Sequence, residues 1–273
     1  MSEPVPPFTL RASSADGAAR MRSAARTGTG RALKAILCAA LFLLAIGAGL
    51  VGYWGYLAYF GGERFVAIPA TGRPVPGRAD MAAVIVSGDM GFSIGMGPRV
   101  ARRLSADGIP VLGVNSLVYF RQRRTPEEIR VLITDAVRRG LAQGHARRLI
   151  LIGQSFGADM VHVGLTGLPP ALRRRIAMVA LVVPTNTVDY QASPAELLDL
   201  ARPDADALTT ARRLNWVPVL CVHGREETDS LCPRLDAANV HRVALPGGHP
   251  LRRDVDALYM ALTTGMDAYA RRF

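Results

Sequence analysis

The chain has 273 residues, of which 49% are hydrophobic, and it carries a formal net charge of +11. This length and composition fit one globular domain with an appendage, and they exclude a disordered or a fibrous protein. A high positive charge is common in nucleic-acid-binding proteins, but the basic residues are dispersed along this sequence, so we predict no nucleic-acid partner.

A long uncharged segment follows a basic N-terminus. Residues 1–34 contain six basic residues against two acidic ones and few large apolar side chains, which predicts a disordered tail. Residues 35–62 contain no charged residue, and about 20 apolar residues suffice to cross a bilayer as a helix. Aromatic residues, which favour the membrane–water interface, cluster at its far end: Tyr53, Trp54, Tyr56, Tyr59 and Phe60.

The charge asymmetry around this segment predicts its orientation. By the positive-inside rule the basic N-terminus stays in the cytoplasm, and the rest of the chain is exported. We therefore predict a single-pass inner-membrane anchor with a periplasmic domain, and a cleaved signal peptide is the alternative. The positive charge of the exported domain predicts attraction to anionic membrane lipids.

After a Pro- and Gly-rich linker at 63–80, residues 81–273 alternate short apolar runs with amphipathic segments. Repeated strand–helix alternation predicts an α/β fold with a mostly parallel sheet and helices on both faces. The predicted strands are Ala82–Ser87, Ile109–Val114, Leu149–Gly153, Met178–Val183, Val217–Val222 and Val240–Leu245. The predicted helices are Gly97–Asp107, Thr125–Gly144, Phe156–Gly167, a broken region in Ser193–Arg213 and Asp254–Arg271.

A G-x-S-x-G pentapeptide, Gly153-Gln154-Ser155-Phe156-Gly157, follows the third of these strands. A serine at a sharp strand-to-helix turn is held away from the sheet, and the flanking glycines let strand and helix approach each other. Because the upstream run is a buried strand and the downstream run is helical, we predict that Ser155 is a catalytic nucleophile.

The acidic residues Glu227 and Asp229 follow the predicted strand Val217–Val222, and His249 follows Val240–Leu245. Functional groups gather at this edge of a parallel sheet. The chain order Ser, acid, His is that of the α/β-hydrolases. His249, in a glycine-rich loop, is the predicted base for Ser155. For the acid, the spacing after Gly224 favours Glu227. Asp229 is shorter and lies nearer to Cys232; the balance favours Asp229, and both remain candidates.

Acyl transfer also needs hydrogen-bond donors for the developing oxyanion. The N–H group of the residue after the nucleophile, Phe156, is the expected first donor. The glycine-rich segment that follows Ala82–Ser87 can turn a second amide inward, and we predict this donor to be Asp89 or Met90.

Three cysteines bear on the compartment and on cofactors. Cys38 lies in the apolar segment, whereas Cys221 and Cys232 enclose a short loop in a domain expected outside the cytoplasm, which predicts a disulfide. No His or Cys pair has the spacing of metal ligands, so we predict no metal and no cofactor.

Several stretches together resemble the VirJ and AcvB group of bacterial periplasmic virulence-associated proteins. The resemblance covers about Ala82 to His249. Its motifs are Val86-Ser87-Gly88-Asp89, Asn115 to Phe120, Arg124-Thr125-Pro126-Glu127, Ile152 to Asp159, Cys221 to Asp229 with Cys232-Pro233, and Leu245-Pro246-Gly247-Gly248-His249. This sequence has Asn115 where the family usually has aspartate.

The resemblance implies an α/β-hydrolase with little or no lid that acts on lysyl-phosphatidylglycerol and releases the amino acid from the lipid. In that case Asp159 could meet the cationic aminoacyl group, or it could pair locally on its helix. Membership of this group would also permit a second role, as a non-catalytic partner of an exported secretion or envelope complex.

Overall fold

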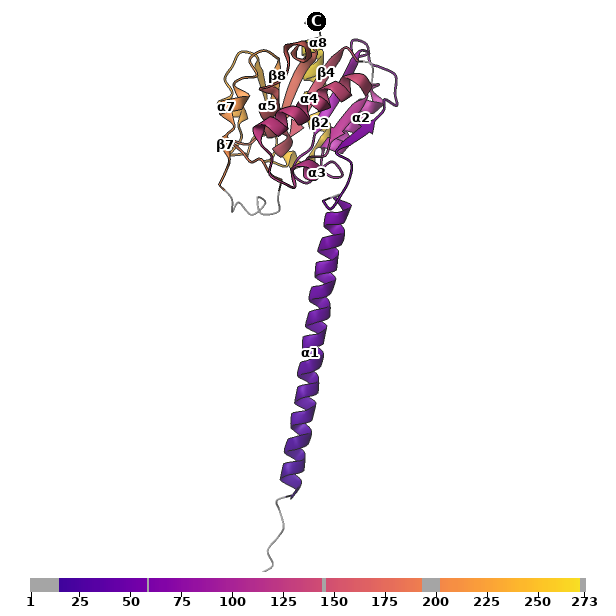
Figure 1. Cartoon of the computed structure of the whole chain (residues 1–273), viewed down its shortest axis with the longest axis vertical. Coiled ribbons are helices and arrows are strands. Elements are labelled where there is room, and N and C mark those ends of the chain that lie inside the picture. The colour runs from indigo at the N-terminus through magenta and orange to yellow at the C-terminus, as the bar shows by residue number, and fades with distance from the viewer. Residues whose placement is uncertain (1–14, 58, 144–145, 193–201, 271–273) are drawn as a thin grey trace, which may run out of the picture. The chain divides into compact units, whose positions relative to one another are not determined.

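The computed structural model describes residues 15–57, 59–143, 146–192 and 202–270. The chain divides into two compact units, which meet in the sequence between Tyr53 and Trp54. The first unit holds most of helix α1 (Ala15–Tyr56), which Figure 1 shows as one continuous helix. The second unit holds the sheet and the other helices.

Helix α1 begins well before the apolar segment. The residues from Ala15 to Lys34 include many alanines and arginines, which have high helix propensity, so this part of the predicted disordered tail is helical. Residues 1–14 lie outside the described part. Residues Leu33–Tyr56 have a mean hydropathy of 2.5, and none of this stretch is buried. By length and composition it fits a membrane anchor or a signal sequence.

The second unit is built on a seven-stranded sheet in the order β1-β3-β2-β4-β5-β8-β9. All neighbours are parallel except β1, which runs antiparallel to β3 at one edge. The strands are β1 (Phe65–Ile68), β2 (Met81–Val86), β3 (Val111–Val114), β4 (Arg148–Gln154), β5 (Ile176–Val182), β8 (Val219–Gly224) and β9 (Val240–Leu245). A separate two-stranded sheet pairs β6 (Thr187–Val188) with β7 (Ala205–Asp206).

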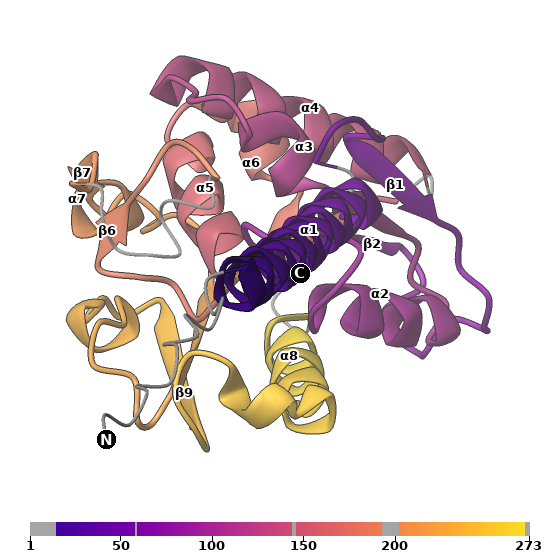
Figure 2. The same ribbon diagram turned by 90° about the horizontal axis from the view of Figure 1, so that it is seen from below.

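Helices cover both faces of the large sheet, with α4, α5 and α6 on one side and α2 and α8 on the other (Figure 2). The helices are α2 (Gly97–Ala106), α3 (Ser116–Phe120), α4 (Pro126–Gln143), α5 (Phe156–Leu165), α6 (Pro170–Arg173), α7 (Leu208–Ala211) and α8 (Val255–Ala270). Two 3₁₀ helices, η2 (Cys232–Arg234) and η3 (Leu251–Arg253), lie near the carboxyl ends of β8 and β9.

Burial on both faces explains why the central strands are continuously apolar. All residues of β2 and β5 are buried, whereas the edge strand β9 is partly exposed along its length. Each fully buried Val or Leu side chain contributes about 1.5–3 kcal/mol through the hydrophobic effect. The two clusters formed by alternate side chains of these strands therefore fix the sheet on which the site is built.

The predicted linker at 63–80 is part of this domain. It contains β1, which extends the sheet beyond β3, and Arg78, which is buried. The guanidinium of Arg78 donates to Asp267 in α8, with an N–O distance of 2.7 Å. A four-residue strand next to prolines and glycines carries too weak a periodic signal to be predicted from the sequence.

The six predicted strands match β2, β3, β4, β5, β8 and β9 within about two residues at each end, an error typical of element boundaries. Four of the predicted helices match α2, α4, α5 and α8. Of the broken region predicted in Ser193–Arg213, residues 193–201 lie outside the described part, and the remainder contains β7 and α7.

Candidate active site

Ser155 occupies a strained turn between β4 and α5. Its backbone angles are φ 53° and ψ −129°, a region that residues with a side chain rarely adopt. Ser155 lies at the carboxyl end of β4, and its N–H group donates to the carbonyl oxygen of Val182 in β5, which helps to hold the strained turn. Strain of this kind persists at functional sites because the surrounding structure enforces it.

The two glycines of the pentapeptide are required by close backbone approach. A Cβ atom at Gly153 would lie 2.5 Å from Cα of Ala158, and one at Gly157 would lie 2.3 Å from the carbonyl oxygen of Val86. Real Cβ contacts are longer than 3.0 Å. The first glycine therefore lets helix α5 fold back against β4, and the second lets it pass over the end of β2.

Three side chains, distant in the sequence, form one hydrogen-bonded chain. Oγ of Ser155 lies 2.7 Å from Nε2 of His249, and Nδ1 of His249 lies 2.6 Å from Oε1 of Glu227. The second oxygen of Glu227 accepts from the N–H group of Gly224 at 3.2 Å. An imidazole that is held by a carboxylate and faces a serine hydroxyl is placed to take the proton of that hydroxyl.

The carboxylate that contacts His249 belongs to Glu227, and the sequence-based preference for Asp229 is corrected. The side chain of Glu227 is only 1% exposed, whereas Asp229 is an exposed residue. The backbone carbonyl oxygen of Asp229 accepts a hydrogen bond from the N–H group of Asn186. The tight turn after β8, in which the Glu227 N–H group donates to the Gly224 carbonyl oxygen, aims Glu227 inward.

The environment of His249 favours its charged form. The hydrogen bond to Glu227 raises the pKa of His249 above its usual value, and the negative charges of Glu227 and Asp229 act in the same direction. Partial burial of the imidazole acts in the opposite direction. Glu227 therefore stabilises the imidazolium that forms when His249 accepts a proton.

Backbone contacts hold together the loop after β8, which carries Glu227, and the loop after β9, which carries His249. The N–H group of Glu226 donates to the carbonyl oxygen of Gly247 at 3.1 Å. A Cβ atom at Gly224 would lie 2.3 Å from the same oxygen, so this approach requires glycine at position 224. The predicted disulfide between Cys221 and Cys232 is present and closes the loop that carries Glu227. Cys38 is free and exposed.

Of the predicted oxyanion donors, Phe156 follows Ser155 directly, and Asp89 and Met90 line the same cavity as Ser155. Phe156 is the first residue of α5, where N–H groups have no partner within the helix. Gly88 lies on the other side of Ser155, because a Cβ atom at Gly88 would be 3.6 Å from Cβ of Ser155. In the described part of the chain, the N–H groups of Asp89 and Met90 donate no hydrogen bond. Both amides therefore remain candidates for the second oxyanion donor.

A cavity of about 400 Å³ opens beside Ser155 and His249. The 88–91 turn, the start of α2 and the segment after His249 form its walls, and Asp89 and Met90 are among the lining residues. Val183 also lines it and has a positive φ of 47°, which is rare for a β-branched residue. The second strained position, at the end of β5, thus adjoins the same cavity as the first.

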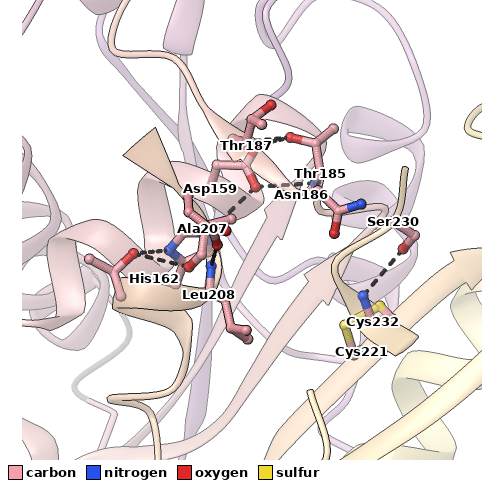
Figure 3. Close-up of polar contacts among 12 residues, drawn as sticks. Asp159, His162, Thr185, Asn186, Thr187, Ala207, Leu208, Cys221, Ser230 and Cys232 are labelled. Atoms are coloured by element: carbon pink, nitrogen blue, oxygen red, sulfur yellow. Dashed lines mark hydrogen bonds and ion pairs between the residues drawn. A yellow bond between two sulfur atoms is a disulfide. The ribbon is translucent and has the colours of Figure 1, made fainter. Parts of the chain in front are cut away.

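Asp159 does not line this cavity, which argues against its predicted contact with substrate. Its carboxylate is buried and accepts from the N–H group of Thr185 at 3.3 Å (Figure 3). It also lies 3.5 Å from Nε2 of His162 one turn along α5. The predicted neighbour on the helix is therefore adjacent, but at this distance it makes no hydrogen bond with the carboxylate. The carboxylate faces the interior because α5 is buried on all sides.

The hydroxyl of Thr185 explains how a buried carboxyl group is accommodated. It lies 2.7 Å from the carbonyl oxygen of Thr187, which can only accept, and 3.0 Å from Oδ2 of Asp159 (Figure 3). One hydroxyl hydrogen serves only one of them. A protonated Asp159 donates to Thr185, which then donates to Thr187. Burial raises the pKa of Asp159, in agreement with this arrangement.

Two arginines that the sequence did not single out also line the cavity, Arg99 in α2 and Arg253 in η3. A signal for the second was present, because two basic residues follow His249 closely in the sequence. Without the fold, nothing connected Arg99 to Ser155. Among the described residues, no group of three or more His, Cys, Asp or Glu side chains is arranged to hold a metal ion.

Solved structures with the α/β-hydrolase fold are similar to this chain. They include a proline iminopeptidase from Mycobacterium smegmatis, with 12% identity, a TM-score of 0.54, and coverage of 76% of this chain and 95% of that one. Est1E from Butyrivibrio proteoclasticus is 14% identical, with a TM-score of 0.52 and coverage of 74% and 95%. At such low identity the similarity establishes the fold alone.

Comparison of sequences gives the family. No curated protein matches this sequence significantly. The model of the family described as bacterial virulence protein (VirJ) matches residues 80–270, which comprise most of the domain, including Ser155, Glu227 and His249. The chain therefore belongs to the VirJ family, and its domain has the α/β-hydrolase fold.

Proposed function

We propose that this protein is a serine hydrolase that cleaves an ester through an acyl-enzyme intermediate. The observation that carries the proposal is the continuous chain from Ser155 Oγ through His249 to Glu227, with distances of 2.7 and 2.6 Å, beside a cavity. A structural turn serine has no need of an imidazole and a buried carboxylate in this order.

The first half of the reaction transfers the acyl group to the protein. Oγ of Ser155 attacks the ester carbonyl carbon while Nε2 of His249 accepts the hydroxyl proton. The N–H groups of Phe156 and of Asp89 or Met90 stabilise the oxyanion. The C–O bond to the alcohol then breaks, and His249 returns the proton to the leaving alcohol oxygen.

The second half releases the acid. A water molecule attacks the acyl-serine carbonyl carbon, and its proton passes to His249. The bond to Ser155 Oγ breaks, and the same proton restores the serine hydroxyl. Glu227 keeps Nδ1 of His249 protonated throughout, so that Nε2 stays available for the reaction.

The substrate we propose is the aminoacyl ester of an aminoacyl-phosphatidylglycerol, of which lysyl-phosphatidylglycerol is the type. Such a substrate presents an ammonium group next to the scissile carbonyl. Among the described cavity-lining residues, the free carboxylate is that of Asp89, whereas Asp159 is buried elsewhere and position 115 is asparagine. We therefore assign recognition of the ammonium to the Asp89 side chain, and its backbone N–H remains a candidate oxyanion donor.

The apolar helix supports a location at the substrate's membrane. We propose that α1 is an uncleaved anchor with its basic end in the cytoplasm, which places the hydrolase domain in the periplasm. Tethering an enzyme to the bilayer raises the local concentration of a lipid substrate without any new contact in the active site.

The test is turnover of a defined lipid. Full-length protein in non-ionic detergent is mixed with vesicles that contain lysyl-phosphatidylglycerol, and released lysine and phosphatidylglycerol are quantified. We expect release by the wild type and none by Ser155→Ala. If a serine-directed phosphonate labels Ser155 but no lipid turns over, the protein is a hydrolase of another specificity. If folded protein is neither labelled nor active, a non-catalytic role in an exported complex replaces the proposal.

A further inference from the structure

An arginine-lined groove adjoins the proposed active site. It has a volume of about 500 Å³ and lies between α2 and the start of α8. Arg99 and Arg253 line both this groove and the cavity beside Ser155. The two hollows therefore meet at these arginines, which form the border between them.

The charges in the groove do not cancel. Arg103 forms an ion pair with Asp256, and Oδ1 of Asp254 accepts from the N–H group of Ala257 at 2.9 Å. The guanidinium groups of Arg99 and Arg253 have no carboxylate partner among the described residues, and the same holds for Arg102. Unpaired guanidiniums at the rim of a cavity favour an anionic ligand.

The backbone next to His249 is strained in a way that sets the position of Arg253. Leu251, Arg252 and Arg253 have φ values of 49°, 52° and 57°, all in the left-handed region that residues with a Cβ avoid. Leu251 is buried and anchors the segment in the core below α8. Arg252 is directed to Glu226, with an N–O distance of 3.3 Å, while Arg253 lines the cavity. Two consecutive strained residues, Leu251 and Arg252, therefore lie between the base and the cavity arginine, which is strained as well.

We propose that Arg99 and Arg253 form an anion subsite that binds a phosphate ester group of the substrate while its carbonyl group lies at Ser155. Guanidinium groups bind phosphate oxygens in bidentate geometry, and they do so better than an ammonium group because they are planar and rigid. The inference rests on the proposed function and extends it: the ester belongs to a molecule with a phosphodiester on its alcohol side. Asp89 and the two arginines then recognise opposite charges of one zwitterionic substrate.

The first test compares two water-soluble esters of the same amino acid. One is the ester of glycerol, which lacks phosphate, and the other is the ester of glycerophosphoglycerol. For full-length protein in non-ionic detergent, we expect the ratio of kcat/KM for the phosphorylated over the neutral ester to fall at least tenfold in the Arg99→Gln/Arg253→Gln double variant. Arg253→Lys, which keeps the charge but not the bidentate geometry, should fall in between.

The matched control is Arg138→Gln. Arg138 is an exposed arginine on α4, which covers the opposite face of the sheet. The ratio should stay at the wild-type value in this variant. An equal fall in Arg138→Gln and in the double variant would mean that total charge, and not a subsite, determines the preference, and it would overturn the proposal.

A second measurement does not depend on turnover. Ser155→Ala protein is titrated with glycerophosphoglycerol alone. Its Kd is compared with the Kd of a triple variant that also carries Arg99→Gln and Arg253→Gln. A rise in Kd of at least tenfold supports the subsite even if neither ester is hydrolysed. An unchanged Kd overturns the subsite even if the protein proves to be an active hydrolase. The two proposals therefore fail separately.

Vesicles distinguish the substrate's own phosphate from the phosphates of neighbouring lipids. In neutral detergent micelles there is no anionic surface, so an effect of the arginine variants there comes from the bound ester. If the variants change activity only when vesicles contain anionic lipid, and leave the ratio in micelles unchanged, the arginines attract the domain to the membrane and the subsite is excluded.

Discussion

Two histidines of this domain lie beside carboxylates, and they have opposite surroundings. His249 contacts Glu227 through Nδ1 and Ser155 through Nε2, and its side chain is 40% exposed next to a cavity. His162 contacts Thr210 through Nδ1 at 2.8 Å, lies 3.5 Å from Asp159 through Nε2, and is fully buried in α5.

The difference shows that access and geometry, more than residue type, decide what a His–carboxylate pair can do. The two hydrogen bonds of the His249 imidazole are short, and they connect the carboxylate of Glu227 to the hydroxyl of Ser155. The contact of His162 with Asp159 is too long for a hydrogen bond, and Nε2 of His162 has no other partner in the described part of the chain. The first pair is placed for proton transfer, and the second links α5 to α7 and to the loop after β5.

The largest expected effect separates the two histidines directly. His249→Gln should lower kcat for a soluble ester by roughly 10⁶-fold, because loss of one member of a triad costs about as much as loss of the whole. His162→Gln should leave kcat of the folded protein within about tenfold, since this side chain touches no reacting group. Steady-state kinetics on both variants, after circular dichroism has confirmed folding, tests the contrast.

The next effect separates the two acids. Glu227→Gln should lower kcat by roughly 10⁴-fold, because the amide does not stabilise the imidazolium and can select the wrong tautomer of His249. Asp229→Asn should change it by less than about threefold, as expected for a charge that acts at a distance across exposed surface. A larger loss in Asp229→Asn than in Glu227→Gln would reverse the assignment of the acid.

The buried hydrogen bonds between Asp159 and Thr185 should contribute to the free energy of unfolding. Asp159→Ala leaves the buried Thr185 hydroxyl and N–H group without their partner and should cost about 1–3 kcal/mol. Asp159→Asn can donate to the Thr185 hydroxyl as the protonated acid does, so it should be close to neutral. Thermal unfolding of the full chain in detergent measures both. Equal destabilisation by the two substitutions would contradict a protonated Asp159.

The sign of the pH dependence follows from the raised pKa of Asp159. The folded state binds the proton more tightly than the unfolded state does, so stability from this group is present at low pH. It is lost as the pH rises from the usual pKa of Asp, about 3.9, through the raised value. The Asp159→Asn variant should lack this decline. A decline of the same size in both proteins would show that other groups cause it.

The smallest effect is a shift of a pH profile. His249 acts as a base only when it is neutral, and its raised pKa moves the acid limb of kcat/KM above about 6.5, the usual value for histidine. In Glu227→Gln the main cause of the raised pKa is removed, so the limb should move to lower pH while the maximum falls. A limb that stays in place would mean that another group titrates.

The sheet could be predicted from the sequence because strands that are buried on both faces consist of continuous runs of apolar residues. Strands such as β5 are apolar throughout, and the two glycines around Ser155 allow α5 to approach β4 closely. The order of serine, acid and histidine then placed all three at one edge. The short strand β1 gave no such signal, and neither did the two-residue strands β6 and β7.

The finer details of the site depend on orientations that a sequence does not encode locally. Glu227 and Asp229 are two residues apart, and which of them turns inward is decided by the hydrogen bond from Gly224 and by the loop around Gly247. Asp159 looked accessible because it follows the nucleophile, yet its helix is buried on all sides. Arg99 lines the cavity because the start of α2 and the segment after His249 form walls of the same cavity.

The most direct measurement of the central claim is mass-spectrometric mapping of a fluorophosphonate adduct on the folded full-length protein. We expect one covalent adduct on Ser155, abolished in Ser155→Ala and formed far more slowly in His249→Gln, with the labelling rate unaffected by His162→Gln. Folded wild-type protein that forms no adduct, or that forms it on another residue, would contradict the claim that Ser155 is activated by His249 and Glu227.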